Sequence, residues 1–350
     1  MDPELQRRIQ DLIAYKGGGH NPGVVEDIIL NALKLLTDVA DTGDVRVIQT
    51  ATRELRYAFK MFAPYAGRRK VTIFGSARTQ PTRIEYQQAV ELGRKLAAAG
   101  YMVITGAGGG IMQAGHEGAG PENSFGANIR LPWEQSANPI IENDKKLVTF
   151  RYFFTRKLIF VRHSDAIVLF PGGFGTMDEG YEALTLMQTG KSQLMPLVLV
   201  DRPGGTYWKT WDRHIREHLL RDRLISKEDL NLYRITEDPD EVVRIIQDFY
   251  RNFQSTRFVR DLFVIRLRIA PPAEVIEVLN RDFADIVTGA RFKVIEATPE
   301  ERADGDHLDS ARIAFGFNRR DYGRVRQLID VLNAPAGGSA DAAPPPSPVA

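Results

Sequence analysis

From residue 70 onward, short apolar segments of strand type alternate along the chain with segments of helical period. The strand-type segments are KVTIF, YMVITG, FGANIRLP, SDAIVLF and MPLVLVD. Strands that alternate with helices form parallel sheets, because each parallel connection needs a crossover that covers one face of the sheet. We therefore predict an α/β fold with a Rossmann-like, doubly wound parallel sheet. One long helix is expected over about residues 145–164, directly before SDAIVLF.

Helical and mixed segments flank this region. In VVEDIILNALKLLTDVA the apolar residues recur at three- and four-residue spacing, which predicts an amphipathic helix. Near the other end, alternating segments such as RDLFVIRLRIA and ARIAFGFN accompany helical ones. The predicted organisation is N-terminal helices over 1–66, the sheet domain over 67–252, a small C-terminal α+β domain of unknown role over 255–334, and a low-complexity, disordered tail over 335–350.

Composition excludes several classes of function. The chain has 46 basic and 45 acidic side chains, a balance that gives no reason to expect nucleic acid or an anionic membrane as a partner. It has no cysteine, so thiolate metal sites and cysteine nucleophiles are excluded. No uncharged run approaches the roughly 20 residues of a membrane span, and the N-terminus lacks an apolar signal core. We therefore expect a cytoplasmic protein. We also expect no metal site, because His214 and His218, which are four residues apart, lack a third ligand.

Three glycine-bearing loops, at 75–78, 106–111 and 171–176, each follow a predicted strand. The carboxyl ends of parallel strands meet at one edge of the sheet, where open α/β sheets bind their ligands. Two familiar nucleotide motifs are incomplete in this chain. Ile111 stands where the dinucleotide fingerprint needs its third glycine, and Thr185 stands where a P-loop ending in GKS needs its first. We therefore predict neither NAD binding nor nucleoside triphosphate hydrolysis.

The loop PGGFGTMDEG joins SDAIVLF to a segment of helical period. Its glycines, Gly172, Gly173 and Gly175, are expected to let the backbone approach a ligand closely and to adopt positive φ angles. The N–H groups that open the next helix favour an anion, to which Thr176 adds a hydroxyl, so a phosphate group fits here. An alternative stays open: Thr176 and Glu179 also fit a capping box, in which the glutamate only bonds back to the helix start.

Several stretches resemble, in order, the pattern of the LOG (Lonely Guy) family, once misnamed lysine decarboxylases. PGGFGTMDE is similar to the family's PGGxGTxxE motif, FGSAR to its first loop, and TGAGGGIMQAGHEGA to its TGGGPGIMEAAN stretch. The likeness continues through FGANIRLPWEQSANP and FFTRKLIFVRHSDAIVLF, and it covers about residues 70–250. One departure is Ala107, which replaces a glycine of the second loop. This change bears on the shape of the loop but removes no charge.

The resemblance implies an N-glycosidase that hydrolyses nucleoside 5′-monophosphates, AMP-like or cytokinin riboside monophosphates, to the free base and ribose 5-phosphate. It implies catalytic roles for Glu179, which would stabilise an oxocarbenium-like ribose or activate water, and for Arg156, which would act on either the base or the phosphate. The expected phosphate- and nucleotide-binding residues are Gly75, Ser76, Gly108, Gly109, Gly110, Gly172, Gly173, Gly175 and Thr176, and the base-pocket candidates are Met112, Trp133 and Glu134.

Other expectations concern neighbouring residues and rival functions. Asp178 is expected to be a surface acid, and His116 to contact either the ligand or solvent on a helix surface. Lys157 lacks the supporting groups of a pyridoxal phosphate site, so we predict neither decarboxylation nor a cofactor. The alternative function is a non-catalytic carrier of a nucleotide or phosphorylated cofactor, although a carrier has no need of both Arg156 and Glu179. The family also implies a homodimer or larger homo-oligomer, with the helix over about 147–163 as part of the contact.

Overall fold

The computed structural model describes residues 2–19, 21–38, 41–132, 136–305 and 307–334. The base-pocket candidates Trp133 and Glu134, and the predicted tail, lie outside these ranges. The chain divides into two compact units, Met1–Tyr57 and Ala58–Ala350. Within the described ranges, no helix is both long enough and apolar enough to cross a membrane.

The first unit is helical. It contains α1 (Pro3–Tyr15) and α2 (Pro22–Asp38), followed by α3 (Thr42–Phe62), whose last residues belong to the second unit. The carboxylate of Asp2 accepts a hydrogen bond from the N–H of Glu4, and Pro3 occupies the first helical position, so α1 begins with a favourable N-terminus. The helix predicted from VVEDIILNALKLLTDVA is confirmed as α2.

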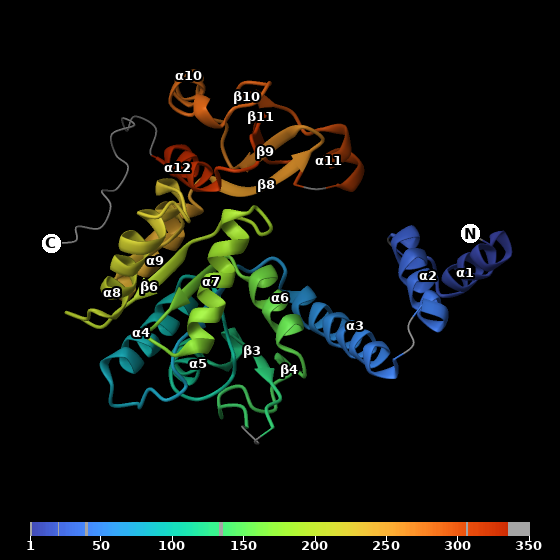
Figure 1. Cartoon of the computed structure of the whole chain (residues 1–350), viewed down its shortest axis with the longest axis horizontal. Helices are drawn as coiled ribbons and strands as arrows, with labels where there is room; N and C mark the ends of the chain where they lie inside the picture. The colour runs from blue at the N-terminus through green and yellow to red at the C-terminus, as the bar shows by residue number, and fades with distance from the viewer. Residues whose placement is uncertain (1, 20, 39–40, 133–135, 306, 335–350) are drawn as a thin grey trace. The chain divides into compact units, whose positions relative to one another are not determined.

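The second unit is built around a parallel sheet of seven strands, in the order β4-β3-β2-β1-β5-β6-β7 (Figure 1). The fold class is therefore confirmed. Every residue of β1, β2, β5 and β6 is buried, as expected for strands covered on both faces. The order reverses at β1, which pairs with both β2 and β5. The strands are β1 (Lys70–Phe74), β2 (Met102–Thr105), β3 (Ser124–Ile129), β4 (Leu147–Phe150), β5 (Ala166–Leu169), β6 (Leu197–Val200) and β7 (Arg234–Thr236).

Helices cover both faces of this sheet. On one face α4 packs against α5 and α9, and α6, α7 and α8 lie on the other (Figure 1). The α-helices are α4 (Ile84–Ala98), α5 (Ile111–Ala119), α6 (Phe153–His163), α7 (Phe174–Gln188), α8 (Tyr207–His214) and α9 (Pro239–Phe249). The short helical turns are η1 (Ala63–Tyr65), η2 (Pro121–Asn123), η3 (Ile215–Leu220) and η4 (Lys227–Leu232).

The long helix expected over about 145–164 is wrong in its first part. Leu147–Phe150 forms β4, which pairs in parallel with β3, and α6 begins only at Phe153. In β4, Val148 and Phe150 are buried while Thr149 is exposed, which is the alternation of a half-buried edge strand. A four-residue strand carries too little pattern to stand out beside the amphipathic helix that follows it.

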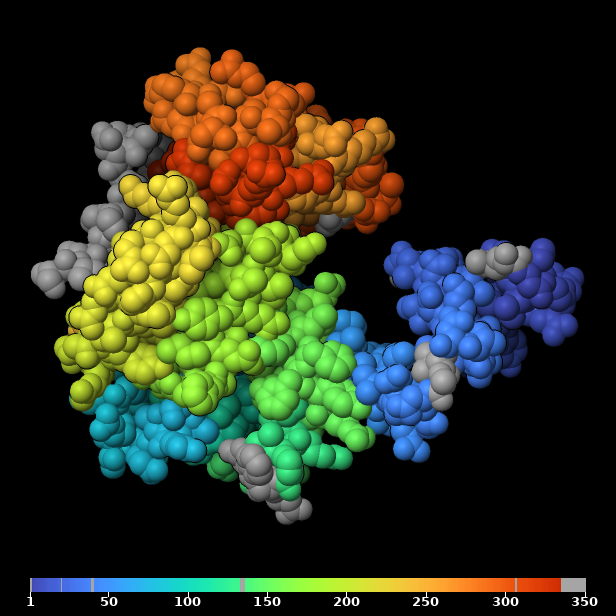
Figure 2. All heavy atoms as spheres, in the orientation of Figure 1, coloured from blue at the N-terminus to red at the C-terminus, as the bar shows by residue number. Residues whose placement is uncertain are grey.

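A second, antiparallel sheet has the order β10-β11-β9-β8. Its last helix, α12, packs against α7 and η4 and so joins the second sheet to the first (Figures 1 and 2). The predicted domain boundaries stay a prediction. The elements are β8 (Phe253–Val259), β9 (Leu262–Leu267), α10 (Ala273–Asp282), η5 (Ala284–Ile286), β10 (Lys293–Ile295), α11 (Pro299–Asp304), β11 (Ala311–Gly316) and α12 (Tyr322–Asn333).

Candidate active site

The three glycine loops meet at the carboxyl edge of β1, β2 and β5, and Ser76 lies at their junction. The N–H of Ser76 donates to the carbonyl of Pro171 at 3.2 Å, and its carbonyl accepts from the N–H of Ile111 at 3.1 Å. A Cβ at Gly110 would lie 2.3 Å from the Ser76 carbonyl, and one at Gly172 would lie 3.1 Å from its nitrogen. Glycine at these two positions is therefore required by the close approach of the loops.

Helix α7 begins at Phe174 with Gly173 as its N-cap, and no side chain caps it. Thr176 is therefore the third residue of the helix rather than its cap, and the capping-box alternative for Glu179 is wrong. The first N–H groups of a helix have no partner within it, so this N-terminus is open to an anion. A Cβ at Gly173 or Gly175 would meet nothing within 4 Å, which leaves free space over the first turn.

The positive φ angles expected in this loop are also wrong. Neither Gly172, Gly173 nor Gly175 is among the described residues with positive φ, and Gly173 has φ −89°. The left-handed residues lie in the second loop instead, at Ala107 (φ 63°) and Gly110 (φ 60°). Gly172 is needed because a Cβ would strike the Thr176 side chain and the first loop, not because of its backbone angles.

Hydrogen bonds from Asn138 hold the second loop in this conformation. Its backbone N–H donates to the carbonyl of Ala107 at 2.8 Å, and its side-chain amide donates to the carbonyl of Gly108 at 3.0 Å. The hydroxyl of Thr105 accepts from the N–H of Ala107 at 3.0 Å. A left-handed alanine costs about 1–2 kcal/mol, and these bonds offset that strain.

His116 supports the same network from beneath. It is fully buried, and its ring contacts the hydroxyl of Thr105, the carbonyl of Phe125 at 3.0 Å and the side chain of Asn138. Burial lowers the pKa of His116 to about 4, although the bonds to Phe125 and Asn138 act in the other direction. Both expected positions of His116, against the ligand or on a helix surface, are therefore wrong.

Glu179 on α7 faces two cations from α6. Its carboxylate lies 3.8 Å from the guanidinium of Arg156 and 3.4 Å from the ammonium of Lys157, and its side chain is only 6% exposed. Lys157 also pairs with Glu182 and with Asp178, whose side chain is 59% exposed and is thus a surface acid, as predicted. The Nε of Arg156 is buried without a hydrogen-bond partner in the described part of the chain. The two predicted catalytic residues therefore lie together, with one donor unused.

Burial is the largest single influence on the pKa of each residue in this group. It raises the pKa of Glu179 above the ordinary value of 4.5, although Lys157 and Arg156 pull it down. Burial likewise lowers the pKa of Arg156, against the attraction of Glu179 and Asp178. Burial also acts to lower the pKa of Lys157, but its carboxylate partners outweigh this and raise it. Glu179 is thus a carboxylate whose proton affinity is raised by its surroundings, as a general base requires.

The remaining described candidates lie around this group. A Cβ at Gly106 would lie 2.7 Å from the sulfur of Met112 and 3.8 Å from the guanidinium of Arg156, so these two side chains converge over the second loop. Gly75 packs against the first residue of α5, and Gly109 lies over the first loop with ordinary spacing. The described residues that the sequence predicted for the site therefore lie together at the carboxyl edge of the sheet.

Tyr207 is a site residue that the sequence did not predict. Its hydroxyl, at the start of α8, donates to the carbonyl of Gly172 at 2.6 Å and so braces the third loop. Burial raises the pKa of this hydroxyl, so it stays protonated and able to donate. The contact joins residues 35 positions apart. No local sequence pattern marks such a pair.

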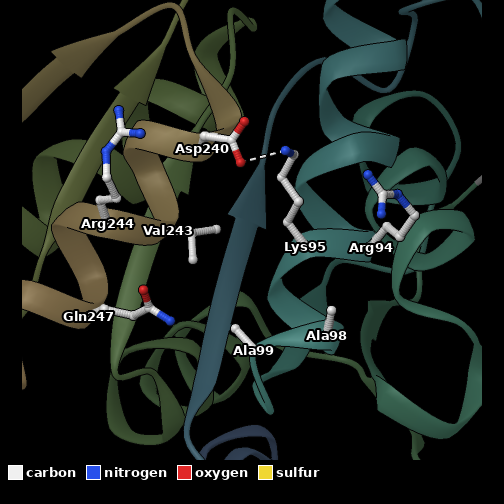
Figure 3. Close-up of a pocket in the computed structure, with 8 residues that line it drawn as sticks. All are labelled: Arg94, Lys95, Ala98, Ala99, Asp240, Val243, Arg244 and Gln247. Atoms are coloured by element: carbon white, nitrogen blue, oxygen red, sulfur yellow. Dashed lines mark hydrogen bonds and ion pairs between the residues drawn. The ribbon is translucent and has the colours of Figure 1, made fainter.

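A shallow hollow of about 410 Å³ lies elsewhere, between α4 and α9 (Figure 3). Lys95 and Asp240 form an ion pair across it, and Arg94 and Arg244 point away on its two sides. It contains none of the loop residues. The pairing of its central charges indicates a bridge between two helices rather than a binding site.

Metal ligation has no evident place in the described ranges. No group of three or more His, Asp or Glu side chains there is arranged to hold an ion. His214 and His218 do lie beside each other, with ring centres 4.9 Å apart.

Comparison with known proteins finds relatives of the sheet domain. Residues 108–246, which include the second and third loops, match the family described as "Possible lysine decarboxylase", the older label of the LOG family. The sheet domain is therefore similar to the LOG family, and because of this similarity we refer to it below as the LOG domain. The chain is 29% identical over 159 residues to "Probable cytokinin riboside 5′-monophosphate phosphoribohydrolase LOGL2" of Oryza sativa subsp. japonica, a match that covers 44% of this chain and 64% of the relative.

A second relative of the LOG domain is "Cytokinin riboside 5′-monophosphate phosphoribohydrolase LOG3" of Arabidopsis thaliana, 28% identical over 128 residues, or 35% of this chain and 57% of the relative. This chain thus spans less than two thirds of either plant protein. Among solved structures, the molybdenum cofactor binding protein of Rippkaea orientalis is 20% identical, with a TM-score of 0.35 over 51% of this chain and 96% of that one.

Proposed function

We propose that the LOG domain hydrolyses the N-glycosidic bond of nucleoside 5′-monophosphates, AMP-like or cytokinin-type, and releases the free base and ribose 5-phosphate. The observation that carries this proposal is the position of Glu179. It is a buried carboxylate with a raised pKa, held between Arg156 and Lys157 one and a half turns into α7, whose uncapped N-terminus suits a phosphate.

The proposed chemistry follows from this placement. The first-turn N–H groups of α7 and the Thr176 hydroxyl hold the 5′-phosphate, which directs the ribose towards Glu179. As the bond between ribose and base breaks, its electron pair leaves with the base and positive charge develops on the ribose. Glu179 stabilises that charge and accepts a proton from the attacking water, whose oxygen forms the new bond to the ribose. The departing base takes up a proton from solvent, and the charged guanidinium of Arg156 stabilises either the departing base or the phosphate.

Relatives support the class of reaction. The two plant proteins are named phosphoribohydrolases of cytokinin riboside 5′-monophosphates. The predicted base-pocket residues are Met112, Trp133 and Glu134, and the assay with several monophosphates decides which base is preferred.

The first test is replacement of Glu179 by glutamine, assayed with AMP, GMP, CMP, IMP and isopentenyladenosine monophosphate. Base release is followed by chromatography, with adenosine and ATP as comparison substrates. We expect base only from monophosphates, and a fall in turnover of roughly 10²–10⁴-fold in the Glu179→Gln variant, since that is the range of general acid–base contributions. Calorimetric binding of the monophosphate should change little, because the phosphate loop is untouched.

Asp178→Asn is the matched control, because Asp178 is the neighbouring carboxylate but is largely exposed. It should keep turnover within about tenfold of the original. Unchanged turnover in Glu179→Gln would remove this residue from the mechanism. Tight binding of monophosphates without base release from any of them would instead establish the carrier function.

The expected homo-oligomer stays a prediction. Two large apolar side chains beside the site are exposed: Phe153 at 52% and Phe174 at 96%. An exposed phenylalanine next to a glycine loop is unfavourable in water, so we propose that a second copy of the chain covers this face.

A further inference from the structure

A second and larger cavity, of about 770 Å³, lies where the LOG domain meets the second sheet. Its walls come from α6, α7, the connection after α7, β8, β9 and α12. It contains no residue of the three glycine loops. Its size is within the range of small-molecule sites in proteins.

Specific contacts fix the floor of this cavity. The side-chain amide of Gln193 accepts hydrogen bonds from the N–H and the hydroxyl of Thr256, at 3.0 and 2.8 Å, and donates to the carbonyl of the same residue at 2.9 Å. Gly190 adopts φ +67° against the ring of Tyr322, where a Cβ would lie 2.0 Å from the ring. These specific contacts between the LOG domain and the second sheet therefore bound the cavity.

Aromatic rings form much of the wall. Phe154, Phe258, Phe263 and Tyr322 all line the cavity. The ring centres of Phe258 and Phe263 lie 4.8 Å apart. The rings of Phe263 and Tyr322 pack edge to face, with their centres 6.4 Å apart. Phe154 stacks on Tyr152, and the guanidinium of Arg319 lies over the ring of Phe258. Phe154 is nevertheless 54% exposed and Phe258 36% exposed, so each ring keeps accessible surface for a planar ligand.

The charges of the wall favour an anion. Lys157, Arg162, Lys191 and Arg257 line the cavity, against the single carboxylate of Glu182. Lys157 and Arg257 have carboxylate partners. In the described part of the chain, Arg162 and Lys191 have no carboxylate within ion-pair distance. The guanidinium of Arg162 lies over the ring of Phe59, 5.7 Å from its centre, but this contact does not neutralise its charge, so both cations can attract an anionic ligand.

We propose that this cavity binds a small aromatic anion, with its ring against the aromatic wall and its acidic group at Arg162 and Lys191. The sequence GKS at 190–192, which does not complete a P-loop, takes part through Lys191. Nucleotides and simple aromatic acids share this chemistry, and the experiment below separates them.

The cavity also adjoins the candidate active site. Lys157 and Glu182 line the cavity, and the ammonium of Lys157 lies 3.4 Å from the carboxylate of Glu179. An anion near Lys157 would compete with the carboxylates for it and change the charge that Glu179 experiences. If the proposed hydrolase function holds, the ligand is therefore a regulator of base release. Binding itself does not depend on that function.

The test is calorimetric titration of the full chain with two probes, ATP and 1-naphthoate. Arg162→Ala and Lys191→Ala should each weaken binding of the effective probe about tenfold or more, the usual effect of losing one charged contact. Arg302→Ala, an exposed cation on α11 outside the cavity, is the matched control and should bind the probe as the original does. Binding of ATP alone assigns a nucleotide, and binding of 1-naphthoate alone assigns an aromatic acid. Either result supports the proposal.

Two results would overturn it. One is the absence of binding by both probes at millimolar concentration, or equal affinity in the two cavity variants and the original. The other is a change of oligomeric state in Phe258→Asp together with no probe binding, which would make the cavity a subunit contact. Base release is measured in parallel with each probe. If the chain binds a probe but releases no base from any monophosphate, the hydrolase proposal is wrong and the cavity proposal stands.

Discussion

Glu179 sits under two opposing influences, burial and its neighbouring cations. Burial raises the pKa of its carboxyl group, while Lys157 and Arg156 lower it. The balance decides at which pH the group is ionised and able to accept a proton. Because Lys157 is the larger of the two cationic influences, its charge can be removed to test the arrangement without touching Glu179 itself.

Replacement of Lys157 by methionine should move the acid limb of the pH profile to higher pH. A carboxylate that loses a nearby cation holds its proton more tightly, so its pKa rises further and the ionised base appears later as pH increases. The measurement is kcat/KM for base release between pH 4 and pH 8. Lys209→Met, on the exposed Lys209–Glu237 pair, is the control and should leave the limb in place. An unshifted limb in Lys157→Met would mean that Glu179 does not govern the profile.

For single residues, the sequence predicted which side chains form the candidate site better than it predicted the contacts that they make. Arg156 and Glu179 lie on the motifs that carry the family resemblance, and they do meet. The capping-box alternative could not be decided from spacing, because the loops of neighbouring strands determine that α7 begins at Phe174. The support given by His116 to Asn138 was not predicted, since the two residues are 22 positions apart and only the fold brings them together.

The end of α7 depends on Gly190. This residue has φ +67°, and the N–H groups of Lys191 and Ser192 both donate to the carbonyl of Leu186, which completes the helix terminus. In Gly190→Ala, the backbone strain of about 1–2 kcal/mol is joined by a clash with Tyr322, because the new Cβ would lie 2.0 Å from its ring. We expect the free energy of unfolding, from urea titration, to fall by about 2–4 kcal/mol.

Gly204 provides a matched control for the substitution at Gly190. Its φ is +71°, but a Cβ there would meet nothing within 4 Å. Gly204→Ala should therefore lose only the backbone part, about 1–2 kcal/mol. Equal losses in the two variants would contradict the close packing of Tyr322 on the end of α7.

Elements were predictable where their pattern was long or strongly apolar. The buried strands β1, β2, β5 and β6 read as continuous apolar runs because they are covered on both faces. β4 was assigned to a helix because four residues of alternation precede the longer period of α6. Short β7, at Arg234–Thr236, was not predicted for the same reason: three residues do not establish a period.

For the whole molecule, the alternation of strands and helices was enough to predict a parallel sheet and the edge at which its loops gather. It was not enough to predict how the second sheet packs. That junction depends on single contacts between distant residues, such as Gln193 with Thr256 and Gly190 with Tyr322. Such contacts leave no periodic trace in a sequence, so the cavity they enclose could be found only in the structure.

The stability of the whole sheet unit should depend on pH through His116. The pKa of this histidine is about 4 in the folded chain and about 6.5 in the unfolded chain. Between these values the unfolded chain binds a proton that the folded chain does not, so the stabilising contribution is complete above about pH 6.5 and is lost as pH falls towards 4. The slope from this one group is at most about 1.4 kcal/mol per pH unit.

The measurement is the free energy of unfolding of the original chain and of His116→Gln, from urea titrations at several pH values between 4.5 and 7.5. The variant should be less stable at pH 7.5, because Thr105, Asn138 and the Phe125 carbonyl lose a well-placed partner. The difference between the two proteins should shrink as pH falls, since only the original carries the titrating group. His163, whose pKa is likewise lowered to about 4 chiefly by burial, is present in both and cancels. A difference that stays constant across this range would show that His116 is not held neutral by the fold.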